Sequence, residues 1–216
     1  MIKAVIFDFD GVLVESVDIK TNAFARLFEA EGKDIVKQIV DYHLMHAGVS
    51  RFEKFRYFYK ALLNRELTEQ KFKELCERFS DLVMEEVIAA PYVKGGKEFL
   101  DTYSAAYKCF IATATPQKEI DDIVKKRRME RYFAGVYGAP KTKSDAVSEI
   151  IRCNQLLPSE IAYIGDAMSD YEAAVTNGIH FMARINNNEP IFKGVDCIKI
   201  KDLNGLKEIL DRMGSL

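Results

Sequence analysis

Two aspartates near the amino terminus are the first residues whose spacing points to chemistry. Asp8 and Asp10 stand at the end of the apolar run Ala4–Phe9, which has the composition of a strand buried on both faces. Residues two apart on a strand point to the same side, so the two carboxylates face roughly the same way. Neighbouring carboxylates in a partly dry cleft repel each other unless a cation or a shared proton relieves them. The pair therefore indicates a Mg²⁺ site or two separated pKa values, and the alternative is two loop acids that cap a turn.

Further polar residues follow later apolar runs. Thr113 closes the run YKCFIAT, Asp166 follows the run EIAYIG, and Asp170 comes one helical turn after Asp166. Lys141 and Lys143 stand just before a predicted helix. Taken singly, these residues have ordinary roles as a helix N-cap, a first-turn acid and solvated lysines. Together they bring carboxylates, a hydroxyl and an ammonium group to consecutive strand ends, which indicates one site.

The elements that must position these residues alternate between strand and helix after Pro91. Between about Val17 and Tyr92 the apolar residues recur at helical spacing, and Ser50 and Thr68 are the expected N-caps. The later strands are predicted at 107–113, 135–137, 160–165, 181–185 and 197–200, and the later helices at 117–128, 144–154, 169–176 and 204–213. This order predicts an α/β fold with a doubly wound parallel sheet and a ligand site at the carboxyl ends of its strands. We expect residues 1–15 and 91–216 to form this core and residues 16–90 to form an inserted all-helical domain.

Composition narrows the class of protein. The 216 residues are 48% hydrophobic and 30% charged, which is typical of a globular chain rather than a disordered or fibrous one. The 31 basic and 33 acidic side chains give a net charge of −2, which argues against a nucleic-acid partner. The 4 cysteines are too far apart for a zinc pair or a CxxC motif and favour a reducing compartment. Because no apolar run fits a signal peptide or a membrane span, we expect a soluble, cytoplasmic protein without a membrane partner.

With these motifs in order, the sequence resembles the haloacid dehalogenase superfamily, in its phosphoglycolate phosphatase and β-phosphoglucomutase-like branch. The matching segments are DFDGVLVES at 8–16, FIAT ending at Thr113, GAPKTKS at 138–144 and GDAMSD at 165–170. The resemblance covers nearly the whole chain. It implies a modified Rossmann-like core with a helical cap inserted after the first motif, which is where the sequence pattern predicts the helical insertion.

The resemblance also implies roles for the acids. Asp8 would be the nucleophile that attacks phosphorus and becomes an aspartyl phosphate, and Asp10 would protonate the leaving oxygen and later activate water. Mg²⁺ would be held by Asp8, the backbone carbonyl of Asp10 and Asp166, while Asp170 orients a ligand or a water molecule.

Phosphoryl binding is assigned in the same way. Thr113, the backbone N–H of Ala114 and one lysine would bind the phosphoryl oxygens. The lysine is either Lys143, which directly precedes a helix, or Lys141, which would belong to a Lys-Pro-x-Pro-Asp motif. Because Thr142 and Ser144 occupy the proline positions of that motif, we favour Lys143.

One cap segment also resembles the β-phosphoglucomutase-like branch. The segment Gly48-Val49-Ser50-Arg51 matches a cap motif whose arginine meets an anionic part of the substrate. Arg51 would then select a substrate with a second charge, and the alternative is a solvated arginine at a helix start. His43 and His46 precede this segment and are expected to be structural.

The predicted function is a Mg²⁺-dependent phosphatase that acts on a small phosphorylated metabolite such as phosphoglycolate or a sugar phosphate. A sugar phosphomutase is the nearest alternative, since it would use Asp8, Asp10 and the cap arginine as well. A phosphonate-cleaving enzyme would need a cap lysine able to form a Schiff base, and the insertion holds several lysines. A phospho-accepting receiver-like signalling domain is the non-enzymatic alternative. The substrate and the oligomeric state are not predicted.

Overall fold

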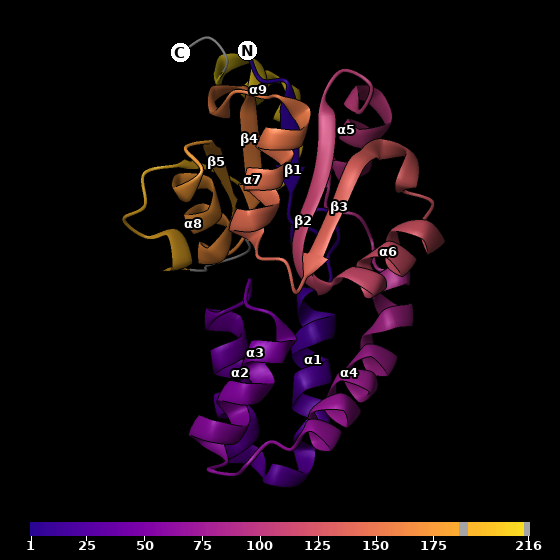
Figure 1. Ribbon diagram of the computed structural model, residues 1–216, viewed down its shortest axis with the longest axis vertical. Helices are drawn as coiled ribbons and strands as arrows, with labels where there is room; N and C mark the ends of the chain where they lie inside the picture. Colours follow the sequence, from indigo (N-terminus) through magenta and orange to yellow (C-terminus); the bar gives the residue numbers. More distant parts are fainter. Residues whose placement is uncertain (186–189, 214–216) are drawn as a thin grey trace.

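A six-stranded parallel sheet forms the centre of the computed structural model, which describes residues 1–185 and 190–213 (Figure 1). The strands are β1 Ala4–Phe7, β2 Lys108–Pro116, β3 Phe133–Ala139, β4 Ile161–Gly165, β5 His180–Arg184 and β6 Ile198–Ile200. Their order is β3-β2-β1-β4-β5-β6, so the chain winds outward from β1 first to one edge and then to the other. The order reverses beside β1, and this is the position where doubly wound sheets bind ligands.

Helices cover both faces of the sheet. One face carries α5 Gly96–Tyr103, α6 Gln117–Lys126 and α9 Leu206–Met213, and the other carries α7 Lys143–Asn154 and α8 Met168–Thr176. Strand β1 joins both layers, because Val5 and Phe7 pack into one apolar cluster while Ala4 and Ile6 pack into the other. Full burial of its four residues explains why β1 is an unbroken apolar run in the sequence. The predicted α/β fold with a doubly wound parallel sheet is confirmed.

The segment between β1 and α5 is helical and lies beyond the carboxyl ends of the strands (Figure 1). It contains α1 Val17–Leu27, α2 Lys33–Met45, α3 Arg51–Tyr57 with a π-helical turn at Phe58–Leu62, and α4 Glu69–Ala89. Phenylalanine rings from α1, α3 and α4 pack edge to face or tilted in its centre. The predicted N-caps are confirmed, since Ser50 accepts a hydrogen bond from the N–H of Glu53 and Thr68 accepts one from the N–H of Lys71. The division into 1–15 with 91–216 and 16–90 stays a prediction.

Several predicted boundaries move by a few residues. Strand β2 continues past the predicted end at Thr113 to Pro116, which pairs with Ala139 of β3 after a register shift. Helix α6 ends at Lys126 because Arg128, the predicted last residue, has a left-handed φ of 57°. Among the described residues no helix has the length and apolar composition that crossing a membrane requires.

Candidate active site

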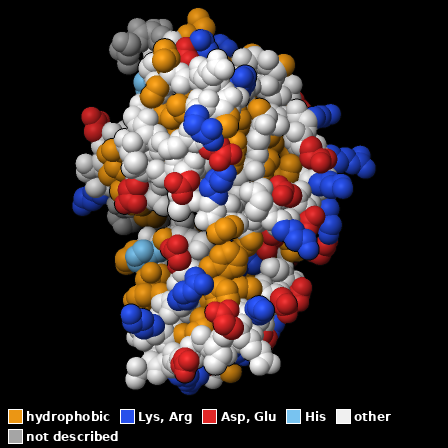
Figure 2. All heavy atoms as spheres, in the orientation of Figure 1, with side chains coloured by type: hydrophobic (Ala, Val, Ile, Leu, Met, Phe, Trp, Pro, Cys, Tyr) orange, Lys and Arg blue, Asp and Glu red, His pale blue; other side chains and the backbone are white. Residues whose placement is uncertain are grey.

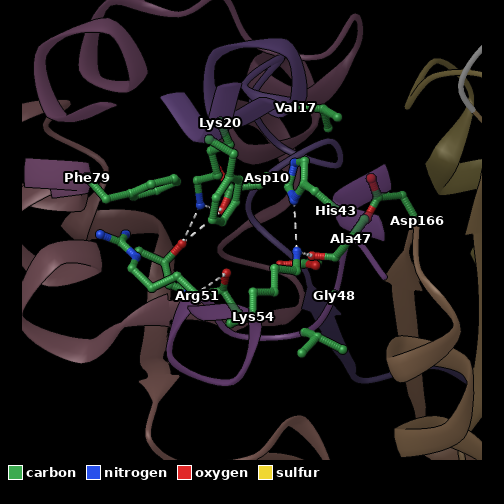
Figure 3. Close-up of a pocket in the computed structure, with 16 residues that line it drawn as sticks. Asp10, Val17, Lys20, His43, Ala47, Gly48, Arg51, Lys54, Phe79 and Asp166 are labelled. Carbon is green, nitrogen blue, oxygen red and sulfur yellow. Dashed lines mark hydrogen bonds and ion pairs between the residues drawn. The ribbon is translucent and has the colours of Figure 1, made fainter. Parts of the chain in front are cut away.

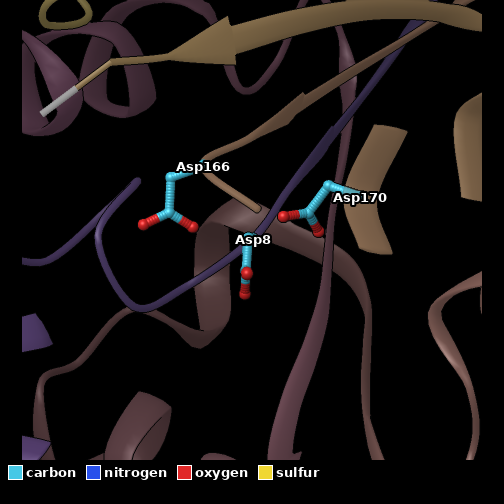
Figure 4. Close-up of side chains that lie close together, drawn as sticks. All are labelled: Asp8, Asp166 and Asp170. Carbon is cyan, nitrogen blue, oxygen red and sulfur yellow. The ribbon is translucent and has the colours of Figure 1, made fainter. Parts of the chain in front are cut away.

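The predicted acids meet where β1 and β4 end. Asp8 follows β1 directly and Asp166 follows β4, and the register pairs Phe7 with Ile164 on these neighbouring strands. Asp170 lies in the first turn of α8. One carboxylate oxygen from each of Asp8, Asp166 and Asp170 lies within 4.8 Å of the others (Figure 4). The parallel register therefore brings together three acids that are far apart in the sequence.

Two glycines make this close arrangement sterically feasible. A Cβ atom on Gly165 would lie 2.2 Å from the Cβ of Asp170, so only glycine lets α8 start so close to β4. A Cβ atom on Gly11 would lie 2.1 Å from Oδ2 of Asp166, and Gly11 also has a left-handed φ of 73°. Both glycines belong to segments that the sequence singles out, DFDGVLVES and GDAMSD.

Lys143 is the ammonium group of this cluster. Its Nζ donates hydrogen bonds to Oδ2 of Asp8 and Oδ1 of Asp170, each at 2.6 Å, and all three side chains are buried. Burial disfavours the charged amine, but Asp170 and Asp8 outweigh it and raise the pKa of Lys143. Lys141 instead pairs with Glu149 and lies over the ring of Tyr137. The geometry thus brings Lys143, and not Lys141, to the acids.

Asp8 and Asp10 have different surroundings. Burial raises the pKa of Asp8 to about 6, with Asp170 adding to this effect and Lys143 opposing it. Asp10 accepts hydrogen bonds from Ser16 Oγ at 2.6 Å, from Thr115 Oγ1 at 2.9 Å and from Lys20 Nζ. Burial opposes its charge, but Lys20 and these hydrogen bonds lower the pKa of Asp10. The two neighbouring carboxyl groups are therefore shifted in opposite directions.

The acid cluster has the charge of a divalent-cation site. Asp8, Asp166 and Asp170 carry three negative charges when ionised and Lys143 carries one positive charge, which leaves −2, while Asp10 is neutralised by Lys20. In the described part of the chain, Asp166 has neither a hydrogen bond nor an ion pair. Burial, Asp8 and Asp170 together raise its pKa. Oxygen ligands are those that Mg²⁺ prefers, so the residues present fit such an ion.

Thr113 and Ala114 line the same pocket as Asp8, Asp10 and Asp166. Figure 3 shows this pocket with Asp10 and Asp166 labelled. Thr113 is buried within β2, and its Oγ1 accepts a hydrogen bond from the N–H of Thr115 at 3.3 Å. Its position inside a strand excludes the alternative that it serves as a helix N-cap.

Arg51 also lines this pocket, but its charge is paired. Its Nη2 lies 2.5 Å from Oε1 of Glu119 on α6, and its Nη1 donates to Ser80 Oγ at 2.9 Å. Ser80 in turn donates to the second carboxylate oxygen of Glu119. The guanidinium lies over the ring of Phe79, 4.4 Å from its centroid. The alternative of a solvated arginine is wrong, and the predicted anion-binding group meets a carboxylate of the core.

Four residues in or beside this site were not predicted to take part in it. They are Lys20, Thr115 and Glu119, described above, and Lys54, which lies in the pocket wall beside His43. The place of Thr115 in the site could have been predicted from the sequence, because Thr115 lies two residues after Thr113 and so shares its face of the strand. Lys20 and Glu119 act across the boundary between the helical segment and the sheet, for which the sequence carries no local signal, whereas Lys54 contacts His43 and Ala47 within the helical segment.

The sequence is similar to those of known proteins over most of its length. A family model described as haloacid dehalogenase-like hydrolase matches residues 5–184. A phosphorylated carbohydrates phosphatase of Thermotoga maritima is 29% identical over 96% of this chain and 100% of its own length. A phosphoglycolate phosphatase of Vibrio vulnificus is 24% identical over 88% of both chains.

Solved structures show the same fold. A β-phosphoglucomutase from Clostridium difficile superimposes with a TM-score of 0.80 at 19% identity, over 100% of this chain and 98% of that one. A predicted phosphoglycolate phosphatase from Haemophilus somnus gives a TM-score of 0.76 at 20% identity, over 96% and 97% of the two chains. The family match over most of the chain, on a fold and a site of this kind, establishes that the protein belongs to the haloacid dehalogenase-like hydrolases.

Proposed function

We propose that the protein is a Mg²⁺-dependent phosphatase that hydrolyses a small phosphate monoester through an aspartyl phosphate on Asp8. The observation that carries the proposal is the convergence of Asp8, Asp166, Asp170 and Lys143 at one edge of the sheet. The names of the full-length relatives support it, since those proteins are phosphatases. The intermixed acidic and basic side chains on the face seen in Figure 2 are in keeping with a small metabolite rather than nucleic acid as partner.

Asp8, Asp166 and the backbone carbonyl of Asp10 would hold the ion, with Asp170 behind them. When bound, Mg²⁺ would offset the repulsion between the Asp8 carboxylate and the incoming phosphate dianion. It would also lower the pKa of Asp8, which lies near 6 without it. The carboxyl group of Asp8 must be ionised to act as a nucleophile. A bound cation would favour this ionised form.

In the first step a carboxylate oxygen of Asp8 attacks phosphorus, and the bond between phosphorus and the ester oxygen breaks. Lys143, which already contacts Asp8, would bind one phosphoryl oxygen. The hydroxyl of Thr113 and the N–H of Ala114 line the same pocket and would bind the others. These donors stabilise the charge that spreads over the phosphoryl oxygens in the transition state.

Asp10 would give a proton to the leaving oxygen and later take one from the attacking water. In the unliganded protein Lys20, Ser16 and Thr115 keep its pKa low, which is the wrong direction for an acid. A phosphate dianion next to Asp10 raises that pKa by repulsion between like charges and competes for Lys20. Substrate binding would therefore protonate Asp10 when the proton is needed.

Residues 16–90 would act as a cap over the core formed by 1–15 and 91–216. The cap segment at Gly48 rests on the site, because Ser169 Oγ donates to the carbonyl of Gly48 at 3.2 Å. A Cβ atom on Gly48 would lie 3.2 Å from Nζ of Lys143. The pocket between cap and core has a volume of about 50 Å³, which is below the usual size of a metabolite site. A substrate would enter when the cap moves away and react when it has returned.

A phosphomutase is the second candidate, because Arg51 of the GVSR segment lies in the pocket wall as it would in such an enzyme. The two activities differ in product. Incubation with phosphoglycolate and hexose phosphates, followed by ³¹P NMR, would give inorganic phosphate from a phosphatase and an isomeric sugar phosphate from a mutase. Activity should require Mg²⁺ and disappear with EDTA. Absence of turnover across phosphorylated metabolites and p-nitrophenyl phosphate would contradict the proposal and favour a receiver-like or binding role.

We also propose a cytoplasmic location. All four cysteines of the chain are unpaired in the structure, which suits a reducing compartment.

A further inference from the structure

Four cationic side chains line or border the pocket, and three of them have carboxylate partners. Lys20 pairs with Asp10, Arg51 with Glu119, and Lys143 with Asp8 and Asp170. Lys54 is different, because no carboxylate of the described residues lies within ion-pair distance of its Nζ. Its polar partners are the Nδ1 atom of His43 at 2.8 Å and the carbonyl of Ala47 at 3.3 Å.

The surroundings of Lys54 are those of a binding site that lacks one partner. Lys54 is 2% exposed and His43 is 4% exposed, yet both line the pocket that also contains Asp8 and Thr113 (Figure 3). The Phe24 ring packs against both, 5.6 Å from Nζ of Lys54 and 4.7 Å from the His43 ring. A buried ammonium group without an anion is costly, because it has lost water and gained only neutral acceptors.

The ring of His43, next to Lys54, also has a polar atom without a partner. Because its Nδ1 accepts the hydrogen bond from Lys54, a neutral His43 ring carries its proton on Nε2. Nε2 is buried and has no hydrogen-bond partner in the part of the chain that is described. Two neighbouring polar groups in one pocket wall are thus incompletely paired, since Lys54 has no anionic partner and Nε2 of His43 has no acceptor.

The protonation states agree with a site that a ligand completes. Burial, with the positive charges of Lys20 and Lys143 adding to it and Asp10 and Asp166 opposing it, lowers the pKa of Lys54 to about 7. Burial, with Lys54 and Lys20 adding to it, lowers the pKa of His43 to about 2, so this ring stays neutral. An anion that contacts Nζ would hold Lys54 in its charged form at neutral pH.

We propose that Lys54, held by His43, binds a carboxylate on the leaving group of the substrate and so selects small phosphate esters of hydroxycarboxylic acids. This inference rests on the proposed phosphatase function and specifies its substrate class. One ammonium beside a neutral imidazole matches a carboxylate monoanion better than a second phosphate dianion. The small pocket favours a leaving group of only a few atoms. Arg51 is a weaker candidate for this role, since Glu119 already neutralises it.

A pair of substrates that differ in one charge tests the proposal. Phosphoglycolate carries the carboxylate, and 2-hydroxyethyl phosphate replaces it with a hydroxymethyl group. Lys54→Met removes the ammonium group and keeps an unbranched side chain that is one heavy atom shorter. It should lower kcat/KM for phosphoglycolate by about 10- to 100-fold, mainly through KM, which is the worth of one charge-assisted hydrogen bond. The same variant should change kcat/KM for 2-hydroxyethyl phosphate by less than about threefold, and Lys54→Arg should recover part of the phosphoglycolate activity.

Equal losses on both substrates would overturn the subsite, as would a wild-type protein that prefers 2-hydroxyethyl phosphate. Binding gives a readout that needs no turnover. In calorimetry, 3-phosphonopropionate should bind the wild-type protein more tightly than propylphosphonate, and Lys54→Met should remove that difference. Carboxylate-dependent binding without hydrolysis of any ester would contradict the phosphatase and keep the subsite. Hydrolysis of esters without any preference for the carboxylate would contradict the subsite and keep the phosphatase.

Discussion

The Nζ atom of Lys143 lies 2.6 Å from Oδ2 of Asp8, although the two residues are 135 positions apart in the sequence. The contact exists because β1 is central in the sheet and α7 begins at the same edge where β1 ends. A second hydrogen bond from Lys143 to Asp170 fixes the ammonium group between two carboxylates. Such a bridge both orients the nucleophile and leaves a positive charge at the place where a phosphoryl oxygen would lie.

The two lysines of the GAPKTKS segment should therefore differ in their effect on turnover. Lys143→Ala should lower kcat/KM by at least about a hundredfold, because it removes a charge that stabilises the transition state. Lys141→Ala removes a half-exposed pair with Glu149 and should cost less than about threefold. Steady-state assays with p-nitrophenyl phosphate compare the two, with circular dichroism as the control for folding. A larger loss for Lys141→Ala would show that the wrong lysine is assigned.

Asp8→Asn tests the covalent route. An amide cannot form an aspartyl phosphate, so turnover should be abolished. The fold should persist, since Asn has the same shape and relieves the repulsion among the three clustered acids. The melting temperature in EDTA should therefore be at least that of the wild-type protein. Measurable hydrolysis by a preparation free of the wild-type protein would refute the role of Asp8.

Asp10→Asn should slow both chemical steps by at least about a hundredfold, the usual contribution of general acid–base catalysis. The loss in the first step should be smaller for p-nitrophenyl phosphate than for an alkyl phosphate, because nitrophenolate leaves without help from a proton. Pre-steady-state measurement of nitrophenolate release separates the two steps. Equal losses for both esters in the first step would mean that Asp10 acts by a means other than proton donation.

Metal binding should depend on pH through Asp8. Without metal its pKa of about 6 lies above its ordinary value, so this group stabilises the fold fully at low pH and loses that contribution as the pH rises through 6. Mg²⁺ binds the ionised form and should reverse the trend. The increase in melting temperature on adding Mg²⁺ should be largest above pH 7 and should shrink towards pH 5. Asp166→Asn is the control and should lose most of this increase, whereas an equal increase at pH 5 and pH 8 would contradict the assignment.

Much of the acid cluster could be predicted because its positions follow from local rules. Asp8 and Asp166 each come directly after an apolar run, and parallel strands end at one edge, so their proximity follows once the topology is inferred. The proximity of Asp170 to Asp166 follows because the two residues are one helical turn apart. The shifts of the strand ends at Phe7 and Pro116 changed no assignment, because the polar residues stay at the same edge.

The contacts across the cap could not be predicted in this way. Lys20 reaches Thr115 over 95 positions, and Arg51 reaches Glu119 over 68, from helices whose orientation depends on how the whole cap packs. The sequence places Arg51 at a helix start, which is compatible with solvent, with a substrate or with an ion pair. Only the tertiary structure, in which Arg51 of α3 meets Glu119 of α6, decides among them. The same holds for Lys54, whose distinguishing feature is the lack of a carboxylate nearby.

The ion pair between Arg51 and Glu119 joins the cap to the core and should act as a closing contact. Glu119→Gln and Arg51→Gln should each raise KM by about tenfold, because a buried ion pair that loses one partner destabilises the closed form. The rise should be the same for phosphoglycolate and 2-hydroxyethyl phosphate, unlike the carboxylate-specific effect of Lys54→Met. The double variant should be no worse than either single one, since two glutamines leave no unpaired charge. Steady-state kinetics of the three variants measures this coupling. If Glu119→Gln instead lowered KM for phosphoglycolate, freeing Arg51 would have improved anion binding, and Arg51 would serve the substrate rather than closure.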